Sequence, residues 1–198
     1  MDWIKHLSSF GDSTMLLPLS LLLTAMLWRS ESARAAICLL TAVAVCGSVM
    51  VALKIAFLAC GETWGVGILT PSGHASMSSM VYGAFAVVVS RKLGWRTRVG
   101  VGLLCGLLVA CIAVSRVVLG VHSVDEVIVG LSVGLGALSI FALLYFRLQP
   151  GTQINPTILL LASVALIAIL HGVSVPFEEA AYDLALRARA GLSMCAIR

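Results

Sequence analysis

The chain has 198 residues, of which 60% are hydrophobic and only 11% are charged, and its mean hydropathy is +1.07. Because a water-soluble domain carries about 25% charged residues, this composition excludes a disordered chain, a nucleic-acid-binding module and an ordinary cytosolic enzyme. The formal net charge of +4 does not indicate an acidic partner, since the basic residues do not cluster on one face. We therefore expect an all-α, polytopic membrane protein.

Six apolar segments follow one another along the chain, and most approach the roughly 20 residues needed to span the hydrocarbon of a bilayer. They cover residues 13–28, 35–59, 74–90, 97–115, 124–147 and 156–175. The first is short and contains Pro18, which membrane helices tolerate. The stretches 99–115 and 127–146 contain no charged residue. The pattern predicts a bundle of six transmembrane helices that forms one membrane domain over residues 1–198.

The two ends of the chain differ from the apolar segments. Residues 1–12 are mixed and polar and lack the pattern of a signal peptide, so the first segment is expected to remain as an anchor. Residues 176–198 have ordinary charge density, which favours a helix lying in the membrane interface.

The six cysteines do not indicate a disulfide framework. Single thiols in apolar runs behave as small hydrophobes, and four of the six lie in such runs: Cys38, Cys46, Cys105 and Cys111. Neither a pairing nor a redox compartment follows from them.

The basic residues predict the orientation, because cytoplasmic loops are rich in Lys and Arg. If the loops alternate across the membrane, one side holds Arg29, Arg34, Arg91, Lys92, Arg96, Arg98 and Arg147. The other side holds Lys5, Lys54, Arg116, Arg187, Arg189 and Arg198. Lys54 and Arg116 lie within or at the edge of apolar segments, and the last three lie in the tail, which leaves Lys5 alone. We expect the loop 91–98 to be cytoplasmic and both termini to face outward.

The first polar cluster, residues 70–76, leads from a loop into the third apolar segment. Gly73 lets the backbone approach a ligand closely, and Ser72 is a suitable helix cap. The free amides at a helix start attract an anion. The alternative is a plain helix cap whose histidine, His74, rests at the membrane interface. By themselves these residues favour neither interpretation.

The second cluster joins the fourth and fifth apolar segments: Ser115, Arg116, His122, Asp125 and Glu126. On a helix, either carboxylate shares a face with the imidazole of His122 and could bond one ring nitrogen, leaving the other to attack. The alternative is that Arg116 snorkels from a helix end and that the carboxylates are first-turn acids favoured by the helix dipole.

Lys54, near the outer end of the second segment, has two interpretations as well. It snorkels to the headgroups, or it serves as a point charge on a phosphate. The residues of both clusters and Lys54 are all expected at the outer face. Histidines, cations, a hydroxyl, a glycine and carboxylates at one depth are the residue types of a phosphoryl-transfer site. His6 and His171 lie outside both clusters, and no Cys or His pair has metal-ligand spacing on this face. We interpret His171 as a hydrogen-bonded residue of the bundle.

The joint pattern resembles the type 2 phosphatidic acid phosphatase family of membrane lipid phosphatases. It consists of Lys54, then Pro71-Ser72-Gly73-His74, then Ser115-Arg116, and then His122 with a carboxylate four residues later. The resemblance covers roughly residues 54–146 with specific motifs, and the remainder only by hydropathy.

This resemblance implies a metal-independent phosphatase that uses no cofactor and forms a phosphohistidine. His122 would be the nucleophile, and His74 would protonate the leaving oxygen and later activate water. The phosphoryl oxygens would be held by Lys54, Ser72, the Gly73 amide and Arg116, with Ser115 ranked lower.

Two positions depart from the family pattern. The family's first motif continues to Arg-Pro, whereas this chain has Gly61 and Glu62, so one phosphate-binding cation is missing. The family's last motif ends in Asp, and Glu126 occupies that position. We expect Glu126 to orient His122, with Asp125 as the second candidate.

The expected protein is an outward-facing lipid phosphatase in a bacterial inner membrane, with its active site on the periplasmic side. The resemblance suggests undecaprenyl pyrophosphate, phosphatidylglycerophosphate and phosphatidic acid as substrates. A lipid phosphotransferase with the same phosphohistidine is a close alternative. An anion transporter and a catalytically inactive relative are the others. The partners are therefore the lipid substrate and the bilayer.

Overall fold

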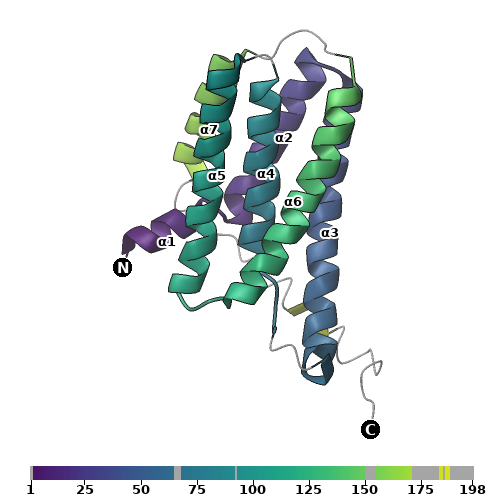
Figure 1. Cartoon of the computed structure of the whole chain (residues 1–198), viewed down its shortest axis with the longest axis vertical. Coiled ribbons are helices and arrows are strands. Elements are labelled where there is room, and N and C mark those ends of the chain that lie inside the picture. Colours follow the sequence, from purple (N-terminus) through teal and green to yellow (C-terminus); the bar gives the residue numbers. More distant parts are fainter. Residues whose placement is uncertain are drawn as a thin grey trace.

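The computed structural model describes residues 2–64, 68–91, 93–149, 155–170, 183–184 and 186–187. Within these ranges every regular element is an α-helix, which confirms the all-α fold class. The helices are α1 (Asp2–Ser9), α2 (Ser13–Ser30), α3 (Ala33–Trp64), α4 (Gly73–Ser90), α5 (Trp95–Val118), α6 (Val124–Arg147) and α7 (Pro156–Leu170) (Figure 1). The predicted segments match α2 to α7 to within a few residues, up to residue 170.

Four helical stretches among the described residues are long and apolar enough to cross a membrane, and they indicate an integral membrane protein. They are Trp3–Ser30, Ala33–Leu58, Trp95–Val118 and Val124–Arg147. Two of the six predicted spans, α4 and α7, are not among them. The described part of the sixth segment ends at residue 170. His171 and nearly all of the predicted interfacial tail lie outside the described residues.

The helix α4 occupies the centre of the bundle and packs against α2, α3, α5 and α6 (Figure 1). Most of its side chains are buried, including those of four serines and one tyrosine. The Ser78 hydroxyl donates to the Ala75 carbonyl at 3.3 Å, and the Ser79 hydroxyl donates to the Ser76 carbonyl at 2.9 Å. Because its neighbours cover it, α4 is buried without a strongly apolar surface of its own. This explains why the mean hydropathy of α4 is too low for it to be among the candidate membrane spans, whereas α3, α5 and α6 are among them.

The helices α4 and α6 cross closely because two glycines of α6 face α4. A methyl group on Gly130 would overlap the carbonyl oxygen of Ser72, and one on Gly134 would overlap the Ser79 hydroxyl and the Ser76 carbonyl. Small residues four apart let membrane helices approach to backbone contact. The start of α4 is thereby fixed against the start of α6, where the two polar clusters lie.

At the other end of the bundle, a buried ion pair ties α2, α4 and α6 together. An Arg91 Nη1 nitrogen lies 3.2 Å from a Glu31 carboxylate oxygen, and its guanidinium stacks 4.4 Å from the centre of the Tyr145 ring. The same guanidinium also donates to the Leu148 carbonyl. A buried pair held by further hydrogen bonds resists separation, because either ion left alone is costly.

The short helix α1 was not expected from the sequence. It projects sideways from the bundle and packs against α5 (Figure 1). The chain then turns through Gly11 into α2, and the Tyr82 hydroxyl of α4 donates to the Phe10 carbonyl at 2.8 Å. The amino-terminal segment is therefore fastened to the two helices that carry the polar clusters.

Candidate functional site

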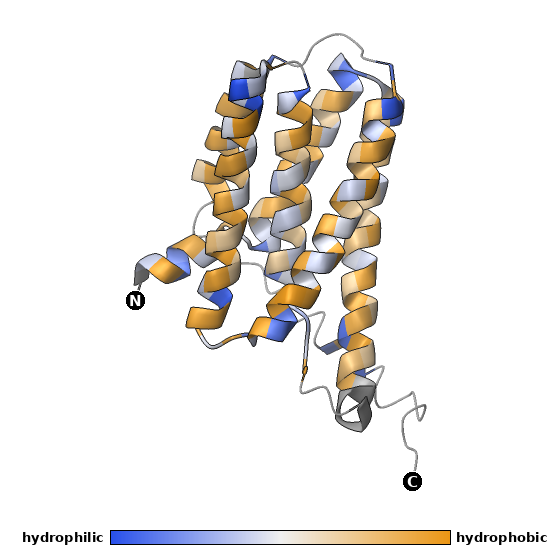
Figure 2. Cartoon of the chain, in the orientation of Figure 1, coloured by the Kyte–Doolittle hydropathy of each residue, from blue (hydrophilic) through white to orange (hydrophobic). Residues whose placement is uncertain are grey.

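The start of α4, the end of α5 and the start of α6 lie at the same end of the bundle (Figure 1). Figure 2 shows hydrophilic residues gathered near the two ends of the helices, with predominantly apolar helix surfaces between them. Most of the candidate polar side chains at this end are buried, at 9% exposure or less: Lys54, Ser72, His74, Ser115, Arg116, His122 and Glu126. Burial of so many polar groups together is costly in an apolar bundle, and it marks a site.

The centre of the site is a contact between His122 and Glu126. The Nδ1 nitrogen of His122 lies 2.9 Å from Glu126 Oε2, and both side chains are buried. Because an ionised carboxylate only accepts hydrogen bonds, this contact places a proton on Nδ1. In the neutral ring the lone pair is then on Nε2, the nitrogen that does not contact Glu126, and a nitrogen with a lone pair can act as a nucleophile.

Backbone amides hold the Glu126 carboxylate from both sides. Its Oε1 oxygen accepts hydrogen bonds from the amides of Leu69 at 2.8 Å and Thr70 at 3.0 Å. Its Oε2 oxygen also accepts from the Ser123 amide at 3.1 Å, and the Ser123 hydroxyl accepts from the Glu126 amide, which completes a capping box. The carboxylate therefore caps α6 and also contacts His122. The interpretation of Glu126 as a first-turn acid of the helix and its interpretation as the partner of His122 are compatible.

The alternative carboxylate, Asp125, is exposed, whereas Glu126 is buried and contacts His122. At the helical spacing of this turn the neighbouring residue points about 100° away. The structure therefore places only Glu126 of the two against the imidazole.

The loop before α4 is joined to the same carboxylate residue. Ser72 donates its amide to the Glu126 carbonyl at 3.0 Å, and its hydroxyl accepts from the Ala75 amide at 3.4 Å as the cap of α4. The helix begins at the next residue, Gly73, so the positive end of the α4 dipole faces this loop. Ser72 is thus a helix cap, as the simpler interpretation predicts. Its amide also bonds to Glu126, the residue that contacts His122.

His74 lies on the first turn of α4, against the turn between α1 and α2. A Cβ atom on Gly11 would lie 3.1 Å from the His74 Cδ2 atom and 2.6 Å from Ile112 Cγ2. Glycine is the residue that allows this close approach. His74 is therefore confined between α4, α5 and the amino-terminal turn.

The turn between α5 and α6 links Arg116 to His122. The Arg116 carbonyl accepts the amides of Val121 at 3.2 Å and His122 at 3.3 Å, and Gly120 adopts a positive φ of 68° that this tight turn requires. The Arg116 side chain points to α1, where its Nη1 nitrogen donates to the Ser8 hydroxyl at 3.1 Å. Ser8 thereby joins a site whose other members come from α3 to α6.

Ser115 and Lys54 differ in how firmly the structure connects them to this cluster. The Ser115 hydroxyl donates to the Ile112 carbonyl of its own helix at 2.6 Å. Lys54 is buried at 8% exposure in α3, which packs against α4 and α6. Cys46 of the same helix contacts Ser76, in the first turn of α4, at 3.2 Å, and Lys54 lies eight residues further along α3, about 12 Å beyond Cys46 in the direction of this end.

The positions of the missing Arg-Pro motif and a possible metal site remain to be considered. Gly61 and Glu62 are helical residues near the end of α3, and their side-chain positions lie outside the described residues. Among the residues that the structure does describe, no three His, Cys, Asp or Glu side chains are grouped to hold a metal ion.

Sequence reasoning missed several contributors to the site. The spacing of Gly130 and Gly134 is a known signal for close helix packing in membranes, and it was available in the sequence. The amides of Leu69 and Thr70 carry no side-chain signal, and neither does Ser8, which is 108 positions away from Arg116. Such partners become visible only when the chain is folded.

A family model described as the PAP2 superfamily matches residues 35–150. The chain is also similar to the protein named "Uncharacterized 22.5 kDa protein in cps region" of Klebsiella pneumoniae, with 28% identity over 188 residues, covering 90% of this chain and 88% of that protein. No solved structure matches the chain.

Proposed function

Because the chain belongs to the PAP2 superfamily, we propose that it is an integral membrane lipid phosphatase acting through a phosphohistidine. Its substrate is a lipid carrying a phosphomonoester or a pyrophosphate. We place the active site on the periplasmic face of a bacterial inner membrane, in one domain of six membrane helices. Family membership and the apolar helices support a phosphatase in a membrane.

The observation that carries this proposal is the buried contact of 2.9 Å between His122 Nδ1 and Glu126 Oε2. A histidine held through Nδ1 offers Nε2 as a nucleophile. The carboxylate also stabilises the positive charge that the ring acquires once Nε2 bonds to phosphorus. The backbone amides around Glu126 keep this carboxylate in place throughout.

In the first step, His122 Nε2 attacks the terminal phosphorus and forms an N–P bond, while the bond from this phosphorus to the leaving oxygen breaks; that oxygen belongs to the lipid alcohol in a phosphomonoester and to the lipid monophosphate in a pyrophosphate. His74 donates a proton to that leaving oxygen. In the second step, His74 takes a proton from water, whose oxygen attacks the phosphorus and releases inorganic phosphate and His122. The two steps balance as hydrolysis and use one acid–base group in both directions.

The phosphoryl oxygens bear the charge that develops during transfer. We assign their stabilisation to the cations Lys54 and Arg116 and to the Ser72 and Gly73 groups at the start of α4. Buried cations interact more strongly with phosphate than exposed ones. Ser115 contributes less, since its hydroxyl already donates to the Ile112 carbonyl.

The substrate is a lipid because the candidate residues lie at helix ends in an otherwise apolar bundle. A headgroup at that depth leaves its chains in the hydrocarbon. The candidate lipids remain undecaprenyl pyrophosphate, phosphatidylglycerophosphate and phosphatidic acid.

The test is phosphate release by the detergent-purified protein from a panel of these lipids in EDTA. We expect EDTA-resistant release that falls by at least about a thousandfold in His122→Ala, since a covalent nucleophile is lost. His6→Ala is the matched control, because His6 is exposed on α1, and it should retain full activity. Release that persists in folded His122→Ala would contradict the phosphohistidine.

The same assay separates the alternative functions. Transfer of phosphate to a second lipid without free phosphate indicates a phosphotransferase. The absence of both reactions from well-folded protein would overturn the enzymatic proposal in favour of an inactive relative or a transporter.

A further inference from the structure

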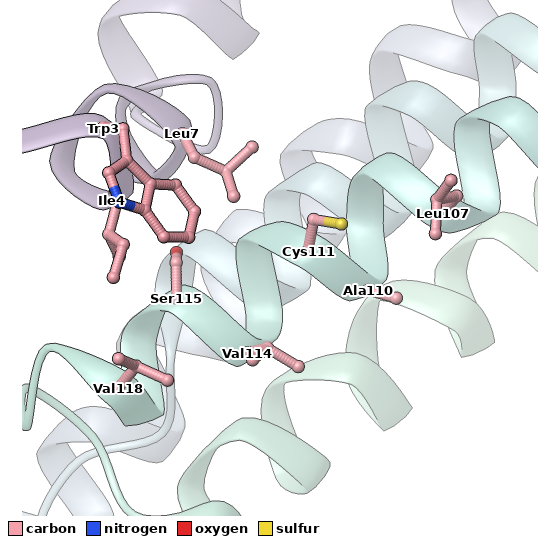
Figure 3. A pocket seen from close by; sticks show the side chains of 9 residues that line it. All are labelled: Trp3, Ile4, Leu7, Leu107, Ala110, Cys111, Val114, Ser115 and Val118. Atoms are coloured by element: carbon pink, nitrogen blue, oxygen red, sulfur yellow. The ribbon is translucent and has the colours of Figure 1, made fainter.

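An apolar cavity of about 370 Å³ lies between α1 and α5. Its volume is within the range of about 300–1,000 Å³ typical of ligand sites. Trp3 and Leu7 line it from α1, and Cys111 and Ser115 line it from α5. Figure 3 shows the Trp3 and Leu7 side chains of α1 facing this surface of α5. Of the residues assigned to the chemistry above, only Ser115 lines this cavity.

One of the two helices that form the cavity, α5, also holds two phosphate-binding candidates. Ser115 lines the cavity, and the next residue, Arg116, donates to the Ser8 hydroxyl at 3.1 Å. Ser8 follows Leu7, a residue of the cavity wall, and both Ser8 and Arg116 are buried. The contact between Arg116 and Ser8 therefore joins the same two helices that form the cavity walls.

The cavity extends along α5 from Val118, at the end of the helix, back to Leu107. Eleven residues of helix correspond to about 16 Å, so the wall runs from the level of the polar site well into the bundle. Ser115 is the one hydroxyl residue of the lining, and it precedes Arg116 in the chain. The remaining wall suits hydrocarbon.

The helix α1 has the character of an interfacial helix. Trp3, Ile4 and Leu7 form one apolar face, on which Trp3 is 69% exposed, and the polar residues Lys5 and His6 are exposed as well. The helix projects sideways from the bundle (Figure 1), at the end that holds the candidate site. A helix of this kind lies at the boundary between headgroups and chains.

We propose that this cavity binds a hydrocarbon chain of the lipid phosphate substrate, with the phosphate next to Arg116. This inference rests on the proposed function and adds to it: α1 and α5 form the chain-binding subsite, and α1 determines which lipids are accepted. Ordinary bilayer lipid is the competing occupant, and it differs by having no preference for a phosphate headgroup.

The experiment is photolabelling of the full-length protein in nanodiscs. One probe is phosphatidic acid with a diazirine in a palmitoyl chain, and the other is a diazirine-bearing farnesyl phosphate. Binding of an acyl chain and binding of an isoprenyl chain are thus tested separately. We expect at least one probe to label residues 3–7 and 107–118. Excess unlabelled lipid phosphate should compete, and phosphatidylcholine should not.

Two leucines of α5 supply a matched pair of variants. Leu107 lines the cavity and is 63% exposed, whereas Leu104 is 69% exposed, lies about one turn further along α5 and does not line it. Leu107→Trp should reduce labelling about tenfold, the effect of displacing roughly two methylene groups. Leu104→Trp should leave it unchanged. Labelling outside the cavity, an equal effect of both substitutions, or equal competition by phosphatidylcholine would each overturn the proposal.

Labelling requires no turnover, so the two proposals fail separately. A protein that is labelled in the cavity and releases no phosphate contradicts the hydrolase and supports the cavity as a lipid phosphate site. A protein that releases phosphate and is labelled elsewhere contradicts the cavity alone.

Discussion

At the scale of single residues, Glu126 combines three tasks that usually fall to separate groups. It caps α6, it accepts the amides of the loop that precedes α4, and it accepts the His122 Nδ1 proton. Aspartate is shorter by one methylene and would reach fewer of these partners from the same backbone position. The departure from the family's aspartate is therefore compatible with the orienting role.

We expect Glu126→Gln to lower kcat by at least about 100-fold, because the neutral amide no longer stabilises the charged imidazole. Glutamine keeps the length of the side chain but replaces one acceptor oxygen by an NH2 donor, which faces either the Leu69 and Thr70 amides or the Ser123 amide, so the melting temperature should fall as well and kcat is measured well below it. The measurement is steady-state phosphate release together with thermal unfolding. Asp125→Asn, at the exposed neighbour, should keep activity within about twofold, and an equal loss there would contradict the assignment.

Ser8 is a positioning residue that acts through Arg116. Ser8→Ala removes a hydrogen bond to a charged group and should raise KM about tenfold with a smaller effect on kcat. Ser8→Thr keeps the hydroxyl and should restore KM. If Ser8→Ala and Ser8→Thr lose activity equally, Ser8 is important for packing instead, and its hydrogen bond to Arg116 does not contribute to activity.

At the scale of elements, the crossing of α4 and α6 sets the site geometry. The hydroxyl-rich face of α4 and the glycines of α6 meet at backbone distance, and this crossing fixes the α4 start beside Glu126. The sequence could predict both helices from their apolar patterns, but not the depth at which they cross. That depth depends on side chains from both helices at once.

Gly134→Ala should destabilise the protein by about 1–3 kcal/mol, since the added methyl overlaps the Ser76 carbonyl. Gly136→Ala is the control on the same helix, because nothing lies within 4 Å of its added Cβ atom. Thermal unfolding in detergent measures both. We expect activity to fall with stability for the first variant only, and equal melting temperatures would contradict the close crossing.

At the scale of the whole molecule, the two ends of the bundle are chemically different. One end holds buried histidines and cations, and the other is fastened by Arg91, Glu31 and Tyr145. The basic loop 91–98 belongs to this second end. The distribution of Lys and Arg therefore predicts that the site faces outward.

Cysteine labelling in intact bacterial cells tests this orientation. In a background with the native cysteines replaced by alanine, Val121→Cys should react with an impermeant maleimide without permeabilisation. Trp95→Cys should react only after permeabilisation. Both positions are exposed, at 52% and 76%. The reverse pattern would place the site on the cytoplasmic side.

The sequence alone determined the helical class, the approximate bounds of α2 to α7, and the residue types in the two polar clusters. These features follow from local patterns: apolar run length, the cap before a helix, and the spacing of one helical turn. The His122–Glu126 contact belongs with them, because four residues on one helix bring the side chains together.

Only the tertiary structure decided which distant groups complete the site. Ser8 reaches Arg116, Gly11 confines His74, and the amides of Leu69 and Thr70 hold Glu126. It also decided that α4, although rich in hydroxyls, lies at the centre of the bundle. The reason is physical: such contacts join residues far apart in the chain, and their formation depends on how all the helices pack together, which no local pattern encodes.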